Sequence, residues 1–238
     1  MIYALDSKGI RIEAARGRRG SCPTCGEGLL AKCGEIKAWH WAHVARLDCD
    51  PWQEHETEWH RGWKALVPPE RAEVCYGEHR ADILGNDDCV VELQHSSISP
   101  GEIREREAFY GRMIWLLDGT PFQDKLRVEK RADEIFFSWS PSRPSWLAAR
   151  KPVFIHGFSI GTHLKIVNKQ TGRLERHWRP IATSGDILQI RRIKTRRWLT
   201  GEARIVTVER FRERMLSFSK YERVAVEHLK VAELPRSE

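Results

Sequence analysis

Long apolar runs are missing from this sequence, since no stretch approaches the ~20 residues that a membrane-spanning helix requires. The opening MIYALDSKGIRIEA lacks the basic start and apolar centre of a secretory signal. Internal repeats and long low-complexity tracts are missing as well. We therefore expect a globular, cytoplasmic protein with no membrane partner, and 238 residues suffice for one large domain or two smaller ones.

Basic residues are scarce in the first half of the chain and abundant in the second. Through Gly119 there are 15 Lys or Arg residues against 20 Asp or Glu residues, whereas the remainder has 25 against 13. We expect the acidic half to carry chemistry and the basic half to hold a polyanion, although a solvated basic face would give the same count.

Cysteines are few, and four of the six fall within Cys22–Cys49 together with two histidines. In a reducing compartment such a group indicates metal rather than disulfides. Cys22, Cys25, His40 and His43 predict a structural Cys2His2 zinc site, and Cys49 could replace either histidine. The spacing does not fit a finger that reads DNA.

The middle of the chain predicts an α/β order of helix, three strands, helix and strand. The first helix is expected over Glu54–Val67, ended by Pro68-Pro69, and the second over 99–111, with Ser99 as cap and Pro100 in the first turn. Between them RAEVCYGEHRADIL and DCVVELQHS read as strands, and MIWLLD follows as the fourth. This order predicts a mixed sheet flanked by helices.

Beyond Gly119 the pattern is weaker. PVFIHGF, THLKIV and DILQIRRI are expected to be strands, VERFRERMLSF a late helix, and the region either completes the sheet or forms a small lobe. Trp139, Trp146, Trp178 and Trp198 either stack on bases or, as the more frequent arrangement, pack in the core.

The hairpin RADILGNDDCVVELQ places two carboxylates opposite each other. A three-residue loop at 86–88 would pair Asp82 with Glu92 and put Gln94 on the same face, whereas a two-residue loop would turn Glu92 away. Opposed carboxylates need a cation, and Mg²⁺ or Mn²⁺ suits oxygen ligands. On the preceding helix, Glu56, His60 and Lys64 recur every four residues and could face this hairpin.

These motifs, taken in order, resemble the competence protein CoiA family. They are Cys22-Pro-Thr-Cys25-Gly26, His40-Trp-Ala-His43, the Glu56 to Lys64 run, Arg80-Ala-Asp82, Glu92-Leu-Gln94-His-Ser96-Ser-Ile98-Ser99 and Glu105-Arg106-Glu-Ala-Phe-Tyr110. The resemblance implies a zinc-binding region over 1–53, a nuclease-like core of the restriction-endonuclease-like PD-(D/E)xK fold over 54–119, and a basic extension over 120–238.

By position, the resemblance makes Asp82, Glu92 and Glu56 the ligands of a catalytic Mg²⁺ or Mn²⁺. Gln94 stands where many nucleases of this fold carry Lys, and Lys64 could supply the missing charge. The catalytic prediction comprises Asp82, Glu92, Gln94, Glu56, His60 and Lys64, and the predicted nucleic-acid contacts are Arg80, Ser96, Arg106, Arg191, Arg192, Arg196 and Arg197.

The leading hypothesis is a metal-dependent nuclease that hydrolyses DNA, in competence-type processing of incoming DNA or in defence against foreign DNA, with protein partners in such a complex. The alternative is a weak or inactive DNA-binding processing factor on the same fold, which Gln94 favours. A third interpretation is a zinc-stapled interaction protein that neither cuts nor binds DNA.

Overall fold

The computed structural model describes residues 1–45, 49–140, 144–168, 170–195 and 199–216. The chain divides into two compact units, Met1–Leu93 and Gln94–Met215, and the C-terminal residues assigned to each lie almost entirely outside the described ranges. No helix within the described ranges is long and apolar enough to cross a membrane.

The first unit begins with a small antiparallel sheet in the order β2-β1-β3-β4-β5. Its strands are β1 Tyr3–Leu5, β2 Arg11–Glu13, β3 Arg19–Ser21, β4 Gly28–Lys32 and β5 His40–His43. Strands β1 and β2 pair as an antiparallel hairpin at the start of the chain. Ala4, Leu29 and Trp41 are the centre of a small core that also buries Cys22. So small an apolar core contributes little stability by itself, so the cysteine cluster described below matters to the stability of this sheet.

The remainder of the first unit is a helix followed by an antiparallel meander. Helix α1 is Glu58–Lys64, and after a 3-10 turn at Pro69–Arg71 come β6 Ala72–Tyr76, β7 His79–Leu84 and β8 Val90–Gln94. Strand β7 pairs with β6 on one side and β8 on the other. The turn between β7 and β8 is the 3-10 segment Asn86–Asp88, which is the three-residue loop that the sequence predicted.

The second unit opens with helix α2, Pro100–Tyr110, and strand β9, Met113–Asp118. Ser99 caps α2 as predicted, because its Oγ accepts a hydrogen bond from the N–H of Glu102 at 3.0 Å. All six residues of β9 are buried. The predicted chain order of helix, three strands, helix and strand is thus confirmed by α1, β6 to β8, α2 and β9.

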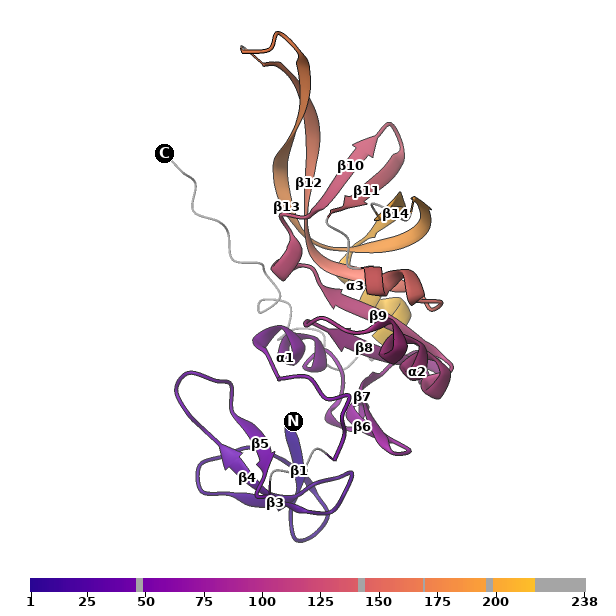
Figure 1. The fold of residues 1–238 in the computed structure, drawn as a ribbon. Coiled ribbons are helices and arrows are strands. Elements are labelled where there is room, and N and C mark those ends of the chain that lie inside the picture. Colours follow the sequence, from indigo (N-terminus) through magenta and orange to yellow (C-terminus); the bar gives the residue numbers. More distant parts are fainter. Residues whose placement is uncertain (46–48, 141–143, 169, 196–198, 217–238) are drawn as a thin grey trace. The chain divides into compact units, whose positions relative to one another are not determined.

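Five further strands of this unit close into a ring of pairings, β10-β11-β14-β13-β12 and back to β10. They are β10 Leu126–Arg131, β11 Glu134–Trp139, β12 Val153–Val167, β13 Leu174–Thr195 and β14 Leu199–Val206, with 3-10 turns at Thr120–Phe122 and Pro144–Ala148. The β10–β12 and β9–β12 pairs are parallel and the others antiparallel. The expected α/β class with a mixed sheet is confirmed. The strands of the basic extension continue that sheet through the β9–β12 pair and also close on themselves through the β10–β12 pair (Figure 1).

After β14, the described residues form two short helical segments, α3 Val208–Phe211 and a π-helical turn at Arg212–Leu216. Of the four tryptophans discussed above, Trp139 and Trp146 are buried, which confirms a core position for both. Trp178 is half-buried on β13, and Trp198 lies outside the described residues.

Candidate functional site

The Cys-Pro-Thr-Cys turn follows directly from the end of β3. The N–H of Cys22 donates to the carbonyl of Glu27 at 2.8 Å, and the N–H of Gly26 donates back to the carbonyl of Cys22 at 2.9 Å. Gly26 has φ +75°, a left-handed conformation that glycine adopts without a side-chain clash. The turn therefore presents both thiols to the same side.

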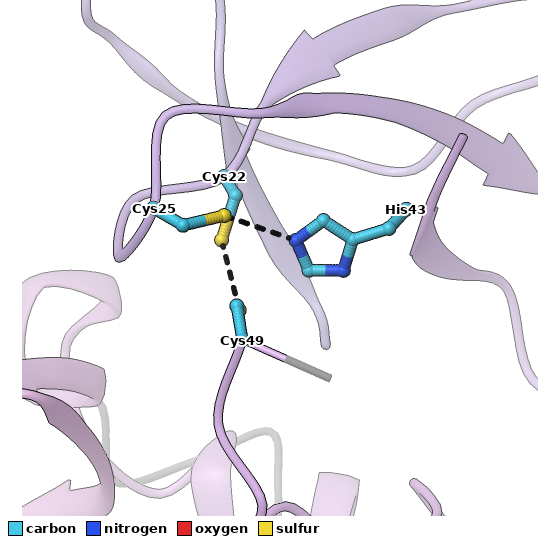
Figure 2. Close-up of side chains that lie close together, drawn as sticks. All are labelled: Cys22, Cys25, His43 and Cys49. Atoms are coloured by element: carbon cyan, nitrogen blue, oxygen red, sulfur yellow. Dashed lines mark hydrogen bonds between the residues drawn. The ribbon is translucent and has the colours of Figure 1, made fainter. Parts of the chain in front are cut away.

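Four potential ligands meet at this turn: Cys22, Cys25, His43 and Cys49 (Figure 2). Their ligand atoms all lie within 4.8 Å of one another, and no other group of three or more such residues does so in the described ranges. Sγ of Cys22 is 3.7 Å from Sγ of Cys49, and Sγ of Cys25 is 3.3 Å from Nε2 of His43. A zinc tetrahedron with bonds of about 2.3 Å to sulfur has edges of about 3.8 Å, so the spacing fits Zn²⁺.

The fourth ligand position is filled by Cys49 and not by His40. His40 and His43 both belong to strand β5, where residues three apart point to opposite faces. Only a helix would bring this pair to one side. His40 instead hydrogen-bonds through Nδ1 to the carbonyl of Ala38 at 2.8 Å. Of the ligand sets left open above, the structure assembles Cys3His with the alternative ligand Cys49.

The surroundings shift the pKa values of two of these thiols in opposite directions. Burial raises the pKa of Cys22, but backbone N–H groups of Cys25 and Thr24 outweigh it and lower that pKa. Burial, together with the neighbouring Cys22 and Cys25, raises the pKa of Cys49 to about 12. Two thiolates side by side repel each other, and a bound divalent cation would remove that cost.

The residue after Cys49 attaches the cluster to strand β7. Asp50 is buried and accepts hydrogen bonds from Nδ1 of His79 and from the backbone N–H of Arg80, each at 2.9 Å. The ring of Trp52 stacks on His79 with centroids 3.3 Å apart. The short stretch from Cys49 to Trp52 thus joins the thiol cluster to the start of the carboxylate hairpin.

Helix α1 is shorter than predicted, and Glu56 lies outside it. The helix begins after Thr57, whose Oγ1 accepts from the N–H of His60 while the N–H of Thr57 donates to Nδ1 of His60. This reciprocal cap fixes the first turn. The predicted helical repeat of Glu56, His60 and Lys64 is therefore wrong, because the cap places Glu56 in the extended chain before the helix.

Lys64 nevertheless meets Glu56, at the centre of a buried carboxylate cluster. Its Nζ lies 3.0 Å from Glu56 Oε2, 3.2 Å from Glu73 Oε1 and 3.0 Å from Asp82 Oδ1. Burial would lower the pKa of Lys64, but the charges of Asp82, Glu56 and Glu73 outweigh it and raise that pKa well above its ordinary value. Lys64 is therefore a permanent cation at neutral pH and not a base.

The predicted register of the hairpin is confirmed. Ile83 pairs with Val91 and Leu84 with Val90, which sets Asp82 opposite Glu92. Each carboxylate accepts a hydrogen bond from the backbone of the opposite strand. Asp82 Oδ2 accepts from the N–H of Leu93 at 3.0 Å, and Glu92 Oε1 accepts from the N–H of Asp82 at 3.4 Å. Asp82 keeps a side chain that is 22% exposed, whereas Glu92 is buried. Asp82, the more exposed of the two carboxylates, is therefore the one that can reach a ligand.

Glu73 belongs to the same cluster, and sequence reasoning missed it. Its Oε2 accepts from the backbone N–H groups of Ile2 at 2.8 Å and Tyr3 at 3.1 Å. Its φ of +50° costs about 1 kcal/mol for a residue with a side chain. Burial would raise the pKa of Glu73, but Lys64 outweighs it and holds the pKa far below the ordinary value. The available signal was a single acidic residue between Ala72 and Val74 in a buried strand.

The N-terminal part of the chain is similar to a known family. Residues 8–51 match the family model described as competence protein CoiA, N-terminal domain. All four residues of the thiol cluster fall within this segment. The N-terminal region is CoiA-like. No curated protein and no solved structure matched the chain.

Beyond the CoiA-like segment, the remaining predicted residues are mostly buried. His60 caps α1 and lies 3.4 Å from Glu54 Oε2; burial lowers its pKa, but the bond to Glu54 and the charge of Asp82 outweigh this and raise it. Gln94 is buried, and its Nε2 donates to the carbonyl of Ser96 at 3.3 Å, while Ser96 itself is exposed.

The predicted arginines fall into three groups. Arg80 and Arg106 are buried, with Arg80 contacting the sulfur of Met1 and Arg106 paired with Glu102, so neither faces a surface polyanion in this structure. Arg191 is exposed on β13, and Arg192 follows it on the same strand. Arg196 and Arg197 lie outside the described residues.

Proposed function

We propose that the chain is a metal-dependent nuclease that hydrolyses DNA phosphodiester bonds, in competence-type processing of incoming DNA or in defence against foreign DNA. The CoiA-like N-terminal region suggests a competence-related role. One observation carries the nuclease proposal: Lys64 Nζ lies 3.0 Å from Asp82 Oδ1, and Asp82 on β7 lies directly opposite Glu92 on β8. Two opposed carboxylates with an adjacent lysine are the chemical content of a PD-(D/E)xK site.

Lys64 would supply the positive charge that is missing at Gln94, the position where many nucleases of this fold carry lysine. Gln94 carries no charge and its amide is engaged with the chain at Ser96. Lys64 comes from α1 instead of β8, and its raised pKa keeps it protonated. A fixed ammonium beside the reacting phosphate would stabilise the negative charge that develops during hydrolysis.

Asp82, Glu92 and Glu56 would hold Mg²⁺ or Mn²⁺. All three are carboxylates, which a hard cation prefers, and Glu56 Oε1 is buried with no hydrogen-bond partner among the described residues. Their oxygens are not gathered as closely as the thiol cluster, and Lys64 contacts both Glu56 and Asp82, so a bound ion would have to displace that ammonium. When bound, such an ion lowers the pKa of a water and offsets charge on the phosphate. Asp82, as the most exposed of the three, would meet the substrate side, while buried Glu92 orients the backbone of Asp82.

The Cys3His cluster would hold Zn²⁺ in a structural role. All four tetrahedral positions are taken by protein side chains, so no position is open for water or substrate. The ion would order the segment that begins at Cys49 and, through the bonds of Asp50 to His79 and Arg80, would support the start of β7.

The test is a cleavage assay on single- and double-stranded DNA and RNA with Mg²⁺ or Mn²⁺, comparing the wild type with Asp82→Ala. We expect the variant to lose about two orders of magnitude in rate or more, as when a ligand or charge in a reacting site is removed. Asp88→Ala is the matched control, because Asp88 lies in the turn of the same hairpin with a side chain that is 77% exposed. Equal cleavage by wild type and Asp82→Ala would overturn the site.

A second candidate function is a DNA-binding processing factor that does not cut. Lys64 already contacts Glu56, Glu73 and Asp82, and this neutralisation favours a stable cluster with no need for a metal ion. Salt-sensitive binding of DNA, with no cleavage under any divalent cation, is the result expected for this function.

A further inference from the structure

Strands β12 and β13 continue beyond the ring of strands as a two-stranded ribbon. The last residue of β12 that pairs with β10 is Ile160. From Gly161 to Val167, β12 pairs with β13 alone among the described strands, opposite Leu174 to Pro180. Seven residue pairs span roughly 20 Å at the usual rise per residue. Figure 1 shows this ribbon, in orange, extending away from β10, β11 and β14.

The base of the ribbon is defined by a bulge. The register shifts between Ile160 and Gly161, and a Cβ on Gly161 would lie 2.3 Å from the carbonyl oxygen of Arg179 and 2.5 Å from the ring of Trp178. Only glycine allows the two strands to approach so closely at this point. The direction in which the ribbon leaves the ring is therefore set by packing.

The tip of the ribbon is also held by specific bonds. The N–H of Asn168 donates to the carbonyl of Arg173, and the N–H of Gly172 donates to the carbonyl of Asn168, both at 2.8 Å. The side-chain oxygen of Asn168 accepts from the N–H of Gln170 at 2.9 Å. Gly172 takes the left-handed conformation at φ +66°. These bonds restrain the described residues of the turn, which lowers the conformational entropy that they lose on binding.

The ribbon exposes apolar side chains at this tip. Ile166 is 47% exposed, Val167 55% and Leu174 61%. An isolated two-stranded ribbon is at best marginally stable in water. A cluster of exposed branched side chains at its end indicates a binding surface.

The charge of the ribbon identifies the kind of partner. Residues 161–181 contain five Lys or Arg residues and a single acidic residue, Glu175. That carboxylate accepts from Asn168 Nδ2 at 2.6 Å and pairs with His177 at 3.1 Å. Lys165, Arg173 and Arg179 are exposed. The partner is therefore a polyanion that also offers apolar surface between its charges.

Strand register places the two kinds of side chain together. Opposed residues share a face, and faces alternate along each strand. By the pairs Val167 with Leu174 and His163 with Trp178, one face carries Lys165 and Val167 from β12 together with Leu174 and Trp178 from β13. This face combines a cation, an aromatic ring and the apolar tip.

We propose that the β12–β13 ribbon is an arm that lies in a groove of double-stranded DNA and inserts the side chains of its tip between base pairs. A two-stranded ribbon fits a DNA groove, and basic side chains along it reach the phosphates on either side. Apolar residues that enter a base step unstack it and bend the duplex. The arm rests on the proposed function only in that DNA is the substrate.

The test measures binding and bending of a DNA duplex of about 30 base pairs by the full chain, without added Mg²⁺ or Mn²⁺. Binding is followed by fluorescence anisotropy and bending by energy transfer between dyes at the two ends. One variant, Lys165→Ala/Arg173→Ala/Arg179→Ala, removes charge, and another, Val167→Ser/Leu174→Ser, removes the apolar tip. Lys8→Ala/Ile10→Ser is the matched control, since Ile10 is 57% exposed and both residues lie in the first unit.

The charge variant should bind more weakly, and its slope of log K against log salt should be less steep by about 3, because each phosphate contact contributes about 0.9. The tip variant should keep the wild-type slope and lose the bend. The control should match the wild type in both. Wild-type binding and bending by both ribbon variants would overturn the arm.

A parallel cleavage assay separates this proposal from the nuclease. Bending that depends on Val167 and Leu174, in a protein that never cleaves, supports the arm and overturns the nuclease. Cleavage that depends on Asp82, with ribbon variants that bind and bend the duplex like the wild type, supports the nuclease and overturns the arm.

Discussion

The thiol cluster at Cys22 and the carboxylate cluster at Lys64 belong to the same unit, and both crowd anionic groups into little space. The carboxylates carry their own counter-charge, because Lys64 contacts Glu56, Glu73 and Asp82. The thiols have Arg80 within electrostatic reach of Cys22, yet the pKa of Cys49 still rises to about 12, because of burial and the neighbouring Cys22. The carboxylate cluster thus contains a cation from the protein itself, whereas the thiol cluster has the chemistry of a structural metal site.

The largest expected effect breaks the thiol side of this comparison. Cys22→Ser should reduce bound zinc from about one ion per chain to none and destabilise the β1 to β5 sheet by several kcal/mol, because structural zinc contributes on the order of 10 kcal/mol in small domains. Metal analysis and thermal melting followed by circular dichroism measure both. Cys33→Ser is the control, since Cys33 is outside the cluster.

The same measurement decides between the two ligand sets. Cys49→Ser should lose zinc as Cys22→Ser does, and His40→Ala should retain it. Zinc loss in His40→Ala with retention in Cys49→Ser would contradict the Cys3His arrangement.

The next largest effect breaks the carboxylate side. Lys64→Met should lower the free energy of unfolding by about 3–5 kcal/mol at pH 7, because it leaves buried carboxylates without their cation. Chemical denaturation measures this, with exposed Lys32→Met as the control.

The pH dependence gives the sign of the effect. In the wild type, the lowered pKa of Glu73 contributes stability that is present above its ordinary value of 4.5 and is lost as the pH falls below it. The variant lacks this contribution, so the deficit should be full at neutral pH and shrink below about pH 4.5. A deficit that stays constant from pH 7 to pH 3 would contradict the role of Lys64.

The smallest effect concerns the helix that positions Lys64. Thr57→Ala removes the acceptor for the N–H of His60 and should cost about 1 kcal/mol of stability. Ser99→Ala at the start of α2 provides the comparison, because its cap bond to Glu102 is of the same kind. If cleavage is detected, its rate should fall in Thr57→Ala and not in Ser99→Ala, since only α1 carries Lys64.

Local patterns in the sequence predicted the parts of the site that depend on near neighbours. The Cys22 turn, the Ser99 cap and the Asp82 to Glu92 register each follow from a few consecutive residues, and the structure has all three. The choice of Cys49 over His40 could not be derived, because it depends on β5 being a strand, and a strand is fixed by its pairing with β4.

Features that depend on distant pairing were missed for the same reason. Glu73 contacts Lys64 in the cluster, and its other carboxylate oxygen is held by the backbone N–H groups of Ile2 and Tyr3, some 70 positions away in the sequence. The parallel contact between β10 and β12 closes the ring of strands, and no turn signal marks such a pairing. The first helix was predicted too long, because the spacing of polar residues from Glu54 onward resembled a helix. The Thr57 cap starts the helix only at Glu58.

Asp50 has a consequence for how the two clusters respond to each other. Its carboxylate ties the residue after Cys49 to His79 and to the amide of Arg80, two positions before Asp82. Any free energy that zinc contributes to ordering Cys49 is therefore shared with the edge of the hairpin, by thermodynamic linkage. Zinc binding would then stabilise the hairpin as well as the thiol cluster. A chain without zinc would hold Asp82 and Glu92 less firmly, although neither carboxylate contacts the metal.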